Sequence, residues 1–238
     1  MATWIVHLRI AENLLVNFPG LNASQFAVGN VAPDSGLPDE KWEKFDPPAE
    51  LLHFSKGDDR FSTSCDLIFF RKYLGKMDFS DDPNRFGFLL GYFTHLVTDN
   101  LWYSEIGKPT QKKFKTQFDA DKNFIWKIRD DWNGLDHVYV REFPGSLFWT
   151  NFLKCSYKAD YLDFLPEKNI QVRVDYIREL YQRDDEEIHA IINRPFQYLS
   201  KAEMNRFVER ASQKIYTWLK ILQTEPTIYH DRNSVTQE

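Results

Sequence analysis

Cysteine is scarce in this chain: two of 238 residues, Cys65 and Cys155, which form no Cys-x-x-Cys pair. A disulfide scaffold and a four-thiolate zinc site are therefore excluded. There is no run of about 18 apolar residues, and the N-terminus lacks the basic region and apolar core of a secretory signal peptide. We therefore expect a cytoplasmic protein without a transmembrane segment. An excess of positive charge is also lacking. The formal net charge of -5 argues against a surface that grips a nucleic acid backbone.

Aromatic residues are abundant by contrast. Phe, Tyr and Trp make up 16% of the chain, which is enough for a large core in a protein whose length suits one compact domain. Although the net charge of the chain is negative, one local cluster is basic, formed by Lys108, Lys112, Lys113 and Lys115. Its simplest interpretation is a solvated loop or helix end, and a phosphate site is the alternative.

Apolar residues recur at helical spacing along most of the chain. The pattern predicts helices over residues 3–18, 59–76, 83–104, 119–142, 147–165, 172–192 and 201–222. Two helix starts carry clear signals, namely Asp82 before Pro83 and the capping box Ser200-Lys201-Ala202-Glu203. Strand-like alternation never exceeds about five residues, so the predicted fold class is all-α.

The predicted organisation is a single multi-helix domain over residues 1–224. Residues 20–54 contain four prolines and are predicted to form a long ordered loop between the first and second helices. Residues 225–238 are predicted to form a polar, frayed C-terminal tail.

The most informative stretch is residues 91–99, which carry His95 and Asp99 four positions apart in an otherwise apolar helix. This spacing places both side chains on one helix face. A buried carboxylate needs a partner, which is either a cation or another side chain. For this pair alone, a core histidine hydrogen-bonded to Asp99 is the simpler interpretation.

Three more residues favour a metal. His7 lies in the first predicted helix, His53 follows two leucines, and Asp34 closes the turn-rich run Gly29–Asp34. Imidazole nitrogens and carboxylate oxygens suit zinc, which in catalytic sites keeps one position open for water. Each residue also has an ordinary interpretation: a partly covered helix histidine, a loop imidazole bonded to backbone, and a turn-stabilising acid.

This ordered series resembles the zinc-dependent phospholipase C family, which is related in fold to the S1/P1-type nucleases. The resemblance covers roughly the first 105 residues and rests on residues 4–11, Gly29–Asp34, His53-Phe54 and residues 91–102. It implies an all-helical fold in which His53, His95 and Asp99 hold one zinc ion. It also implies that His7, with Asp99 shared, contributes to a second ion and that Asp34 is the catalytic general base. The implied reaction is attack of a metal-bound hydroxide on the phosphorus of a phospholipid or related small phosphodiester.

The chain departs from the family pattern at two points. Family members begin with a Trp whose terminal amine and carbonyl bind zinc, whereas Trp4 is internal. No His-x-x-x-Glu motif follows Asp99 to complete a further zinc site. We therefore expect one or two zinc ions rather than three. Asp131 and Asp136 are secondary candidates for a missing ligand, although surface acids or a helix cap are the simpler interpretation.

Two other functions stay open. A non-catalytic protein of the same fold, in which the metal stabilises the chain or binds a ligand without turnover, fits the missing ligands. A nuclease-like or nucleotidase-like hydrolase is the third possibility, disfavoured because the sequence shows no basic groove.

Overall fold

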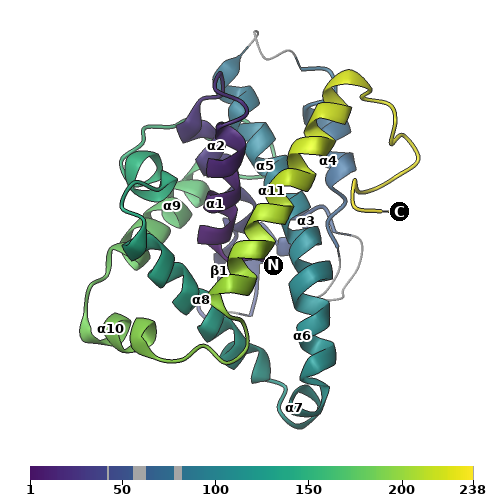
Figure 1. Cartoon of the computed structure of the whole chain (residues 1–238). Coiled ribbons are helices and arrows are strands. Elements are labelled where there is room, and N and C mark those ends of the chain that lie inside the picture. Colours follow the sequence, from purple (N-terminus) through teal and green to yellow (C-terminus); the bar gives the residue numbers. More distant parts are fainter. Residues whose placement is uncertain (42, 56–62, 78–81, 238) are drawn as a thin grey trace.

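The computed structural model describes residues 1–41, 43–55, 63–77 and 82–237, and helices dominate it (Figure 1). Its elements are α1 (Trp4–Leu15), α2 (Ala23–Gly29), the 3-10 turn η1 (Ala32–Asp34), β1 (Leu37–Pro38), β2 (Phe45–Asp46), α3 (Ala49–Leu52), α4 (Asp66–Tyr73), α5 (Pro83–Trp102), the π turn η2 (Tyr103–Gly107), α6 (Lys108–Lys113), α7 (Lys115–Ala120), α8 (Phe124–Glu142), the π turn η3 (Phe148–Phe152), α9 (Glu167–Gln182), α10 (Glu186–Asn193) and α11 (Lys201–Thr224). The two short strands pair antiparallel, Leu37 with Asp46 and Pro38 with Phe45. The all-α prediction is confirmed.

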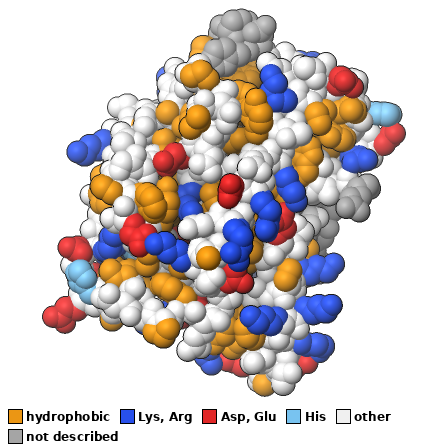
Figure 2. Space-filling view, viewed as in Figure 1, with side chains coloured by type: hydrophobic (Ala, Val, Ile, Leu, Met, Phe, Trp, Pro, Cys, Tyr) orange, Lys and Arg blue, Asp and Glu red, His pale blue; other side chains and the backbone are white. Residues whose placement is uncertain are grey.

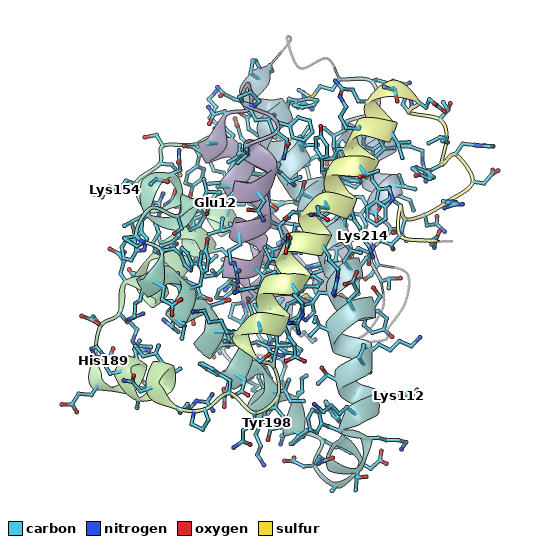
Figure 3. The ribbon with its side chains drawn as sticks, in the orientation of Figure 1. Glu12, Lys112, Lys154, His189, Tyr198 and Lys214 are labelled. Atoms are coloured by element: carbon cyan, nitrogen blue, oxygen red, sulfur yellow. The ribbon has the colours of Figure 1, made fainter. Side chains whose placement is uncertain are left out.

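Helix α5 lies inside the fold and is apolar apart from a few buried polar residues such as His95 and Asp99. Every residue from Gly87 to Trp102 is buried, as expected for a helix enclosed by others. Helices α2, α4 and α11 pack against it, α1 lies beside α11 (Figure 1), and side chains fill the space between the ribbons (Figure 3). Within the described residues, neither α5 nor any other helix has the length and apolar character needed to span a bilayer.

The close approach of α2 and α5 depends on two glycines. A Cβ atom on Gly29 would lie 2.1 Å from the carbonyl oxygen of Phe88, and one on Gly91 would lie 2.3 Å from that of Phe26. A side chain at either position would therefore push the two backbones apart. This contact brings the end of α2 against the middle of α5.

Residues 20–54 are more structured than the loop predicted for them. Asn22 begins α2 by accepting hydrogen bonds from the backbone amides of Ser24 and Gln25. The turn η1, the strand pair and α3 follow. All four prolines of the segment come after Gly29, so α2 contains none of the residues that interrupt helices.

Three predicted helices are divided or largely absent in the structure. The predicted helix 172–192 is divided into α9 and α10 because the Asp185 side chain accepts from the backbone amide of Ile188 and starts a new helix. The predicted helix 119–142 is likewise divided, with α7 ending at Ala120 and α8 beginning at Phe124. The prediction of a helix over 147–165 is wrong beyond η3. There the carbonyl groups of Phe152 and Cys155 accept hydrogen bonds from Arg178 instead of from a following turn.

The two predicted capping signals are confirmed. Asp82 accepts a hydrogen bond from the backbone amide of Arg85 at 3.0 Å, and Ser200 and Glu203 form a complete capping box. The helix predicted over 59–76 corresponds to the shorter α4: its predicted start lies outside the described residues, residues 63–65 are not helical, and the helix ends at Tyr73.

The end of the C-terminal tail packs against the domain, whereas most side chains from Glu225 to Asp231 are exposed. Ser234 and Val235 are 2% and 3% exposed. The Val235 amide donates to Asp66 Oδ1 at 3.0 Å, and Asn100 Nδ2 donates to Asp66 Oδ2 at 2.8 Å. Asp66 therefore joins the tail to α4 and α5. These contacts are long-range, so the polar sequence of the tail did not indicate them.

Candidate metal centre

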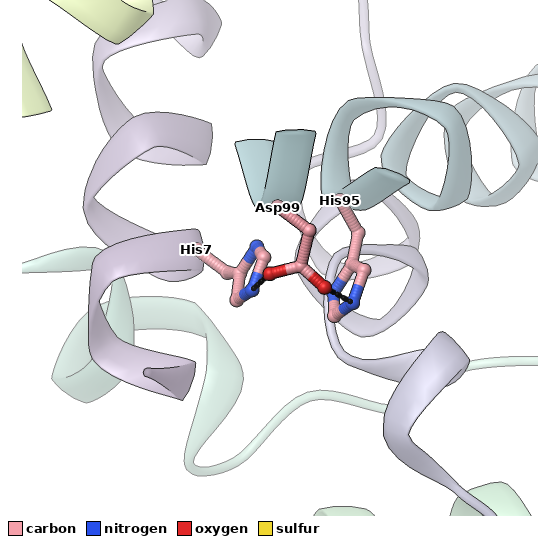
Figure 4. Close-up of side chains that lie close together, drawn as sticks. All are labelled: His7, His95 and Asp99. Atoms are coloured by element: carbon pink, nitrogen blue, oxygen red, sulfur yellow. Dashed lines mark ion pairs between the residues drawn. The ribbon is translucent and has the colours of Figure 1, made fainter. Parts of the chain in front are cut away.

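His95 and Asp99 lie one turn apart on α5 and face the same side of the helix (Figure 4). His95 Nε2 lies 3.4 Å from Asp99 Oδ2. The Ala2 amide donates to Asp99 Oδ1 at 2.7 Å, but Asp99 Oδ2 has no hydrogen-bond donor among the described residues. Leaving a buried charged oxygen without a donor is costly. This oxygen therefore needs a positive charge beside it, either a metal ion or a protonated His95.

Helix α1 contributes His7, which stacks on His95 with ring centroids 3.8 Å apart and an interplanar angle of 5°. His7 Nε2 faces Asp99 Oδ1 at 3.5 Å (Figure 4). Neither ring nitrogen of His7 makes a hydrogen bond within the described part of the chain. A fully buried imidazole with two unpartnered nitrogens is unusual, and one of these nitrogens points at the carboxylate.

His53, at the end of α3, and Asp34, at the end of η1, complete the cluster. His53 Nε2 lies 3.3 Å from His95 Nε2, 3.5 Å from Asp99 Oδ2 and 3.4 Å from Asp34 Oδ1. The indole Nε1 of Trp4 donates to Asp34 Oδ2 at 2.8 Å and so fixes that carboxylate. The structure thus brings five predicted site residues together: His7, Asp34, His53, His95 and Asp99.

Backbone partners define the protonation of two of these histidines. His95 Nδ1 lies 2.8 Å from the carbonyl oxygen of Asn30, and His53 Nδ1 lies 3.1 Å from that of Ala49. Because a carbonyl only accepts hydrogen bonds, each Nδ1 carries a proton, and in the neutral ring Nε2 presents a lone pair. Histidines that bind metals are commonly oriented in this way, by a carbonyl on the opposite ring nitrogen.

Three electron-pair donors form the centre of the cluster. His53 Nε2, His95 Nε2 and Asp99 Oδ2 define a triangle with sides of 3.3, 3.4 and 3.5 Å. With neutral imidazoles none of these atoms donates a hydrogen bond, so they repel one another unless a cation lies between them. Ligand atoms about 2.0–2.1 Å from a tetrahedral zinc ion are about 3.3–3.4 Å apart. The triangle therefore fits one face of a zinc site.

The remaining donors allow a second ion. Two overlapping sets have ligand atoms within 4.8 Å of one another: His7, His95 and Asp99, and Asp34, His53 and His95. His95 has a single unprotonated nitrogen, so it serves only one ion. Asp99 can serve two, because Oδ1 faces His7 whereas Oδ2 faces His53 and His95. The geometry is thus compatible with the predicted sharing of Asp99.

Burial and neighbouring charges set the protonation of the cluster. Burial, reinforced by the charge of His95, lowers the pKa of His7 to about 4. Burial opposes ionisation of Asp34, but the hydrogen bond and charge that His53 supplies in its protonated form, together with the charge of His95, hold the pKa of Asp34 below its ordinary value. Burial likewise opposes ionisation of Asp99, but the charges of the N-terminal amine and of His95 hold its pKa well below the usual range. Both carboxylates are ionised at neutral pH, which is the form that binds metals.

A proton can take the place of a metal in the triangle. Burial lowers the pKa of His95, but the negative charge of Asp99 outweighs it and the net shift is upward. A protonated His95 therefore balances the Asp99 carboxylate when no metal is present. Metal binding has to displace this proton, so metal and proton compete for the same position.

The cluster is almost wholly buried, and its small exposed fraction belongs to three of the five residues. The side chains of His7 and His95 are 0% exposed, whereas those of Asp34, His53 and Asp99 are 11%, 9% and 7% exposed. Asp34 is therefore the member of the cluster with the largest exposed fraction. Some exposure is required of a group that exchanges a proton with a reacting water.

The secondary candidates Asp131 and Asp136 lie outside the cluster. Arg194 Nη1 lies 3.1 Å from Asp131 Oδ1. Thr3 and Tyr181 each donate a hydrogen bond to Asp136 at 2.7 Å. Both acids are buried with donors from the protein itself, and the structure does not bring either of them to the other five residues.

The sequence interpretation missed the groups that orient the cluster. Trp4 had a readable signal, because it precedes His7 by three residues and so lies on the same face of α1. The other groups are backbone atoms, namely the carbonyls of Asn30 and Ala49 and the amide of Ala2. Every residue type carries these atoms, so no side-chain pattern reports them.

The five residues come from α1, η1, α3 and α5, and together they have the features of a metal centre. Three imidazoles and two ionised carboxylates converge, two ring N–H groups are held by carbonyls, and the acid Asp34 is the least buried of the five. No protein-family model, curated protein or solved structure matches this chain, so the geometry and chemistry of the cluster are the basis for assigning a function.

Proposed function

We propose that this chain is a zinc-dependent phosphodiester hydrolase whose substrates are phospholipid head groups or related small phosphodiesters. The main support is the triangle of His53 Nε2, His95 Nε2 and Asp99 Oδ2, whose sides are 3.3 to 3.5 Å. When both imidazoles are neutral, none of these three atoms donates a hydrogen bond. Zinc bound in such a site lowers the pKa of water and offsets negative charge on phosphoryl oxygens.

In this proposal His53, His95 and Asp99 hold one ion, and His7 with the second oxygen of Asp99 holds another. Asp34 is the general base. Its depressed pKa keeps the carboxylate ionised across the neutral range, and the Trp4 indole holds Oδ2 so that Oδ1 keeps a fixed direction. In this role Asp34 Oδ1 orients a water molecule and accepts its proton, and the low pKa of Asp34 makes orientation the larger part of that role.

The charge of the cluster favours an anionic substrate only when two ions are bound. Three neutral imidazoles and two carboxylates carry two negative charges in total. One divalent ion makes the site neutral, and two leave it with two positive charges, which attract a phosphodiester anion. The number of bound ions therefore bears directly on whether the site is catalytic.

A metal-stabilised protein without catalytic activity is the second candidate. Complete burial of His7 and His95 favours it, because structural zinc sites are closed whereas catalytic ones keep an open position. The limited exposure of Asp34 and His53 favours the hydrolase. Measurements of bound metal and of turnover on the same sample separate the two.

The test is hydrolysis of bis-para-nitrophenyl phosphate and of para-nitrophenyl phosphocholine by the zinc-reconstituted chain. We expect turnover that falls by about 100-fold or more in Asp34→Asn, which removes the general base, while zinc content is kept. The exposed Asp160→Asn is the matched control and should retain full activity. Zinc binding without turnover on either substrate leaves only the non-catalytic candidate, and a chain that binds no zinc contradicts both.

A further inference from the structure

A second feature lies away from the metal cluster, in the segment 108–129 formed by α6, α7 and the start of α8. This segment, which we call the basic tip, has seven Lys or Arg and two Asp, a net charge of +5 in a chain whose net charge is -5. The helices α6 and α7 extend beyond the rest of the molecule at the lower right of Figure 1. The basic tip is thus convex and differs in charge from the remaining surface.

Most of the positive charge on the basic tip is not balanced by acids. Lys115 pairs with Asp119 at 2.5 Å, and Lys127 lies 3.5 Å from Asp121. Lys and Arg side chains gather at the edge where α6 lies (Figure 2), and Lys112 points away from the molecule (Figure 3). Within the described ranges, four exposed lysines of the tip make no ion pair: Lys108, Lys112, Lys113 and Lys122.

The basic tip also presents a large apolar side chain. Trp126 is 59% exposed, and the guanidinium of Arg129 lies 5.4 Å from the centre of its ring. A Trp side chain combines an apolar body with one N–H group, which suits the boundary between lipid head groups and acyl chains. Below the surface, Phe124 contacts the rings of Phe114 and Phe118, with centroids 6.1 and 5.2 Å apart. These contacts give the tip its own small core.

We infer that the basic tip docks the chain on an anionic phospholipid surface, with its lysines at the head groups and Trp126 in the interface. Basic residues close to an anionic bilayer each strengthen binding by about fivefold. Nucleic acid is the competing anionic partner, but proteins that bind single strands track the backbone in a positively charged groove. A convex tip with an outward-facing Trp fits a bilayer better. This inference goes beyond the proposed function and does not require hydrolysis.

Co-sedimentation with vesicles of phosphatidylcholine, with and without phosphatidylserine, tests this docking. We expect binding that needs phosphatidylserine and weakens with added salt. The triple variant Lys112→Gln, Lys113→Gln, Lys122→Gln should bind on the order of 100-fold more weakly. The matched triple variant Lys76→Gln, Lys154→Gln, Lys168→Gln removes the same charge from exposed sites outside the tip, and should bind almost as the wild type does. Lys154 and Lys112 lie on opposite sides of the molecule in Figure 3.

The apolar contribution has its own pair of variants. Trp126→Ala should weaken the binding that persists at high salt, whereas Phe143→Ala, which truncates another exposed aromatic, should not. Three results overturn the inference: no vesicle binding by the wild type, equal loss in both triple variants, or tip-dependent binding of an oligonucleotide in preference to vesicles. All are read without measuring turnover, so an inactive chain that binds vesicles contradicts only the proposed hydrolase.

Discussion

Zinc should raise the melting temperature of the chain through the triangle of His53, His95 and Asp99. A ligand present at about 1,000 times its dissociation constant stabilises the native state by about 4 kcal/mol. Unfolding entropy of about 2.1 cal/mol/K per residue amounts to about 0.5 kcal/mol/K for 238 residues. We therefore expect the midpoint of a thermal melt, followed by circular dichroism, to rise by about 8 °C when zinc is added to the metal-free chain.

Two histidine variants make this melt specific to the cluster. His95→Ala removes one corner of the triangle and should abolish the zinc-dependent rise. His189→Ala, at a side chain that is 53% exposed on α10, should leave the rise unchanged. A rise of the same size in His95→Ala would refute the assignment of the triangle, and so would a wild-type melt that is insensitive to zinc.

Two further predictions concern the fold. Gly91→Ala should lower the free energy of unfolding measured in urea by about 3 kcal/mol, because its Cβ meets the Phe26 carbonyl. Gly145→Ala, whose Cβ has no atom within 4 Å, should change this free energy by less than about 1 kcal/mol. Equal effects of the two variants would contradict the close packing of α2 and α5. Burial of His137, with the charges of Arg141 and Arg183, lowers the pKa of this imidazole to about 4, below the ordinary 6.5. The stability that neutral His137 contributes is therefore complete above about pH 6.5 and is lost as the pH falls toward 4. His137→Gln should therefore remove on the order of 3 kcal/mol from the difference in unfolding free energy between about pH 7 and pH 4, and an unchanged pH dependence would count against this burial.

Helices with their own start signals were predictable from the sequence. Asp82 and the capping box at Ser200 act on amides two or three residues away, so local sequence contains the whole interaction. The division between α9 and α10 also has a local cause at Asp185, but the helical period continues across it and hid the break. The docking of Val235 on Asp66 joins residues far apart in the chain, and nothing in the tail sequence indicates it.

The candidate site was predictable in its residue types and less so in its arrangement. Helical spacing alone places His95 and Asp99 on one face, and the structure keeps them 3.4 Å apart. Asp131 and Asp136 had the same residue type and a similar apolar setting, yet each has donors from the protein: the amides of Gln197 and Tyr198 for Asp131, and the Tyr181 hydroxyl for Asp136. Long-range packing decides which buried acid lies beside a histidine and which accepts hydrogen bonds from other groups.

The central claim is that the five clustered residues hold zinc. Elemental analysis of the zinc-reconstituted chain after gel filtration tests it most directly. We predict two zinc ions per chain for the wild type and one for His7→Ala. The double variant His53→Ala, His95→Ala loses the ion of the triangle and should retain at most one. A wild-type chain that retains no zinc, or a double variant that retains as much as the wild type, would contradict the claim.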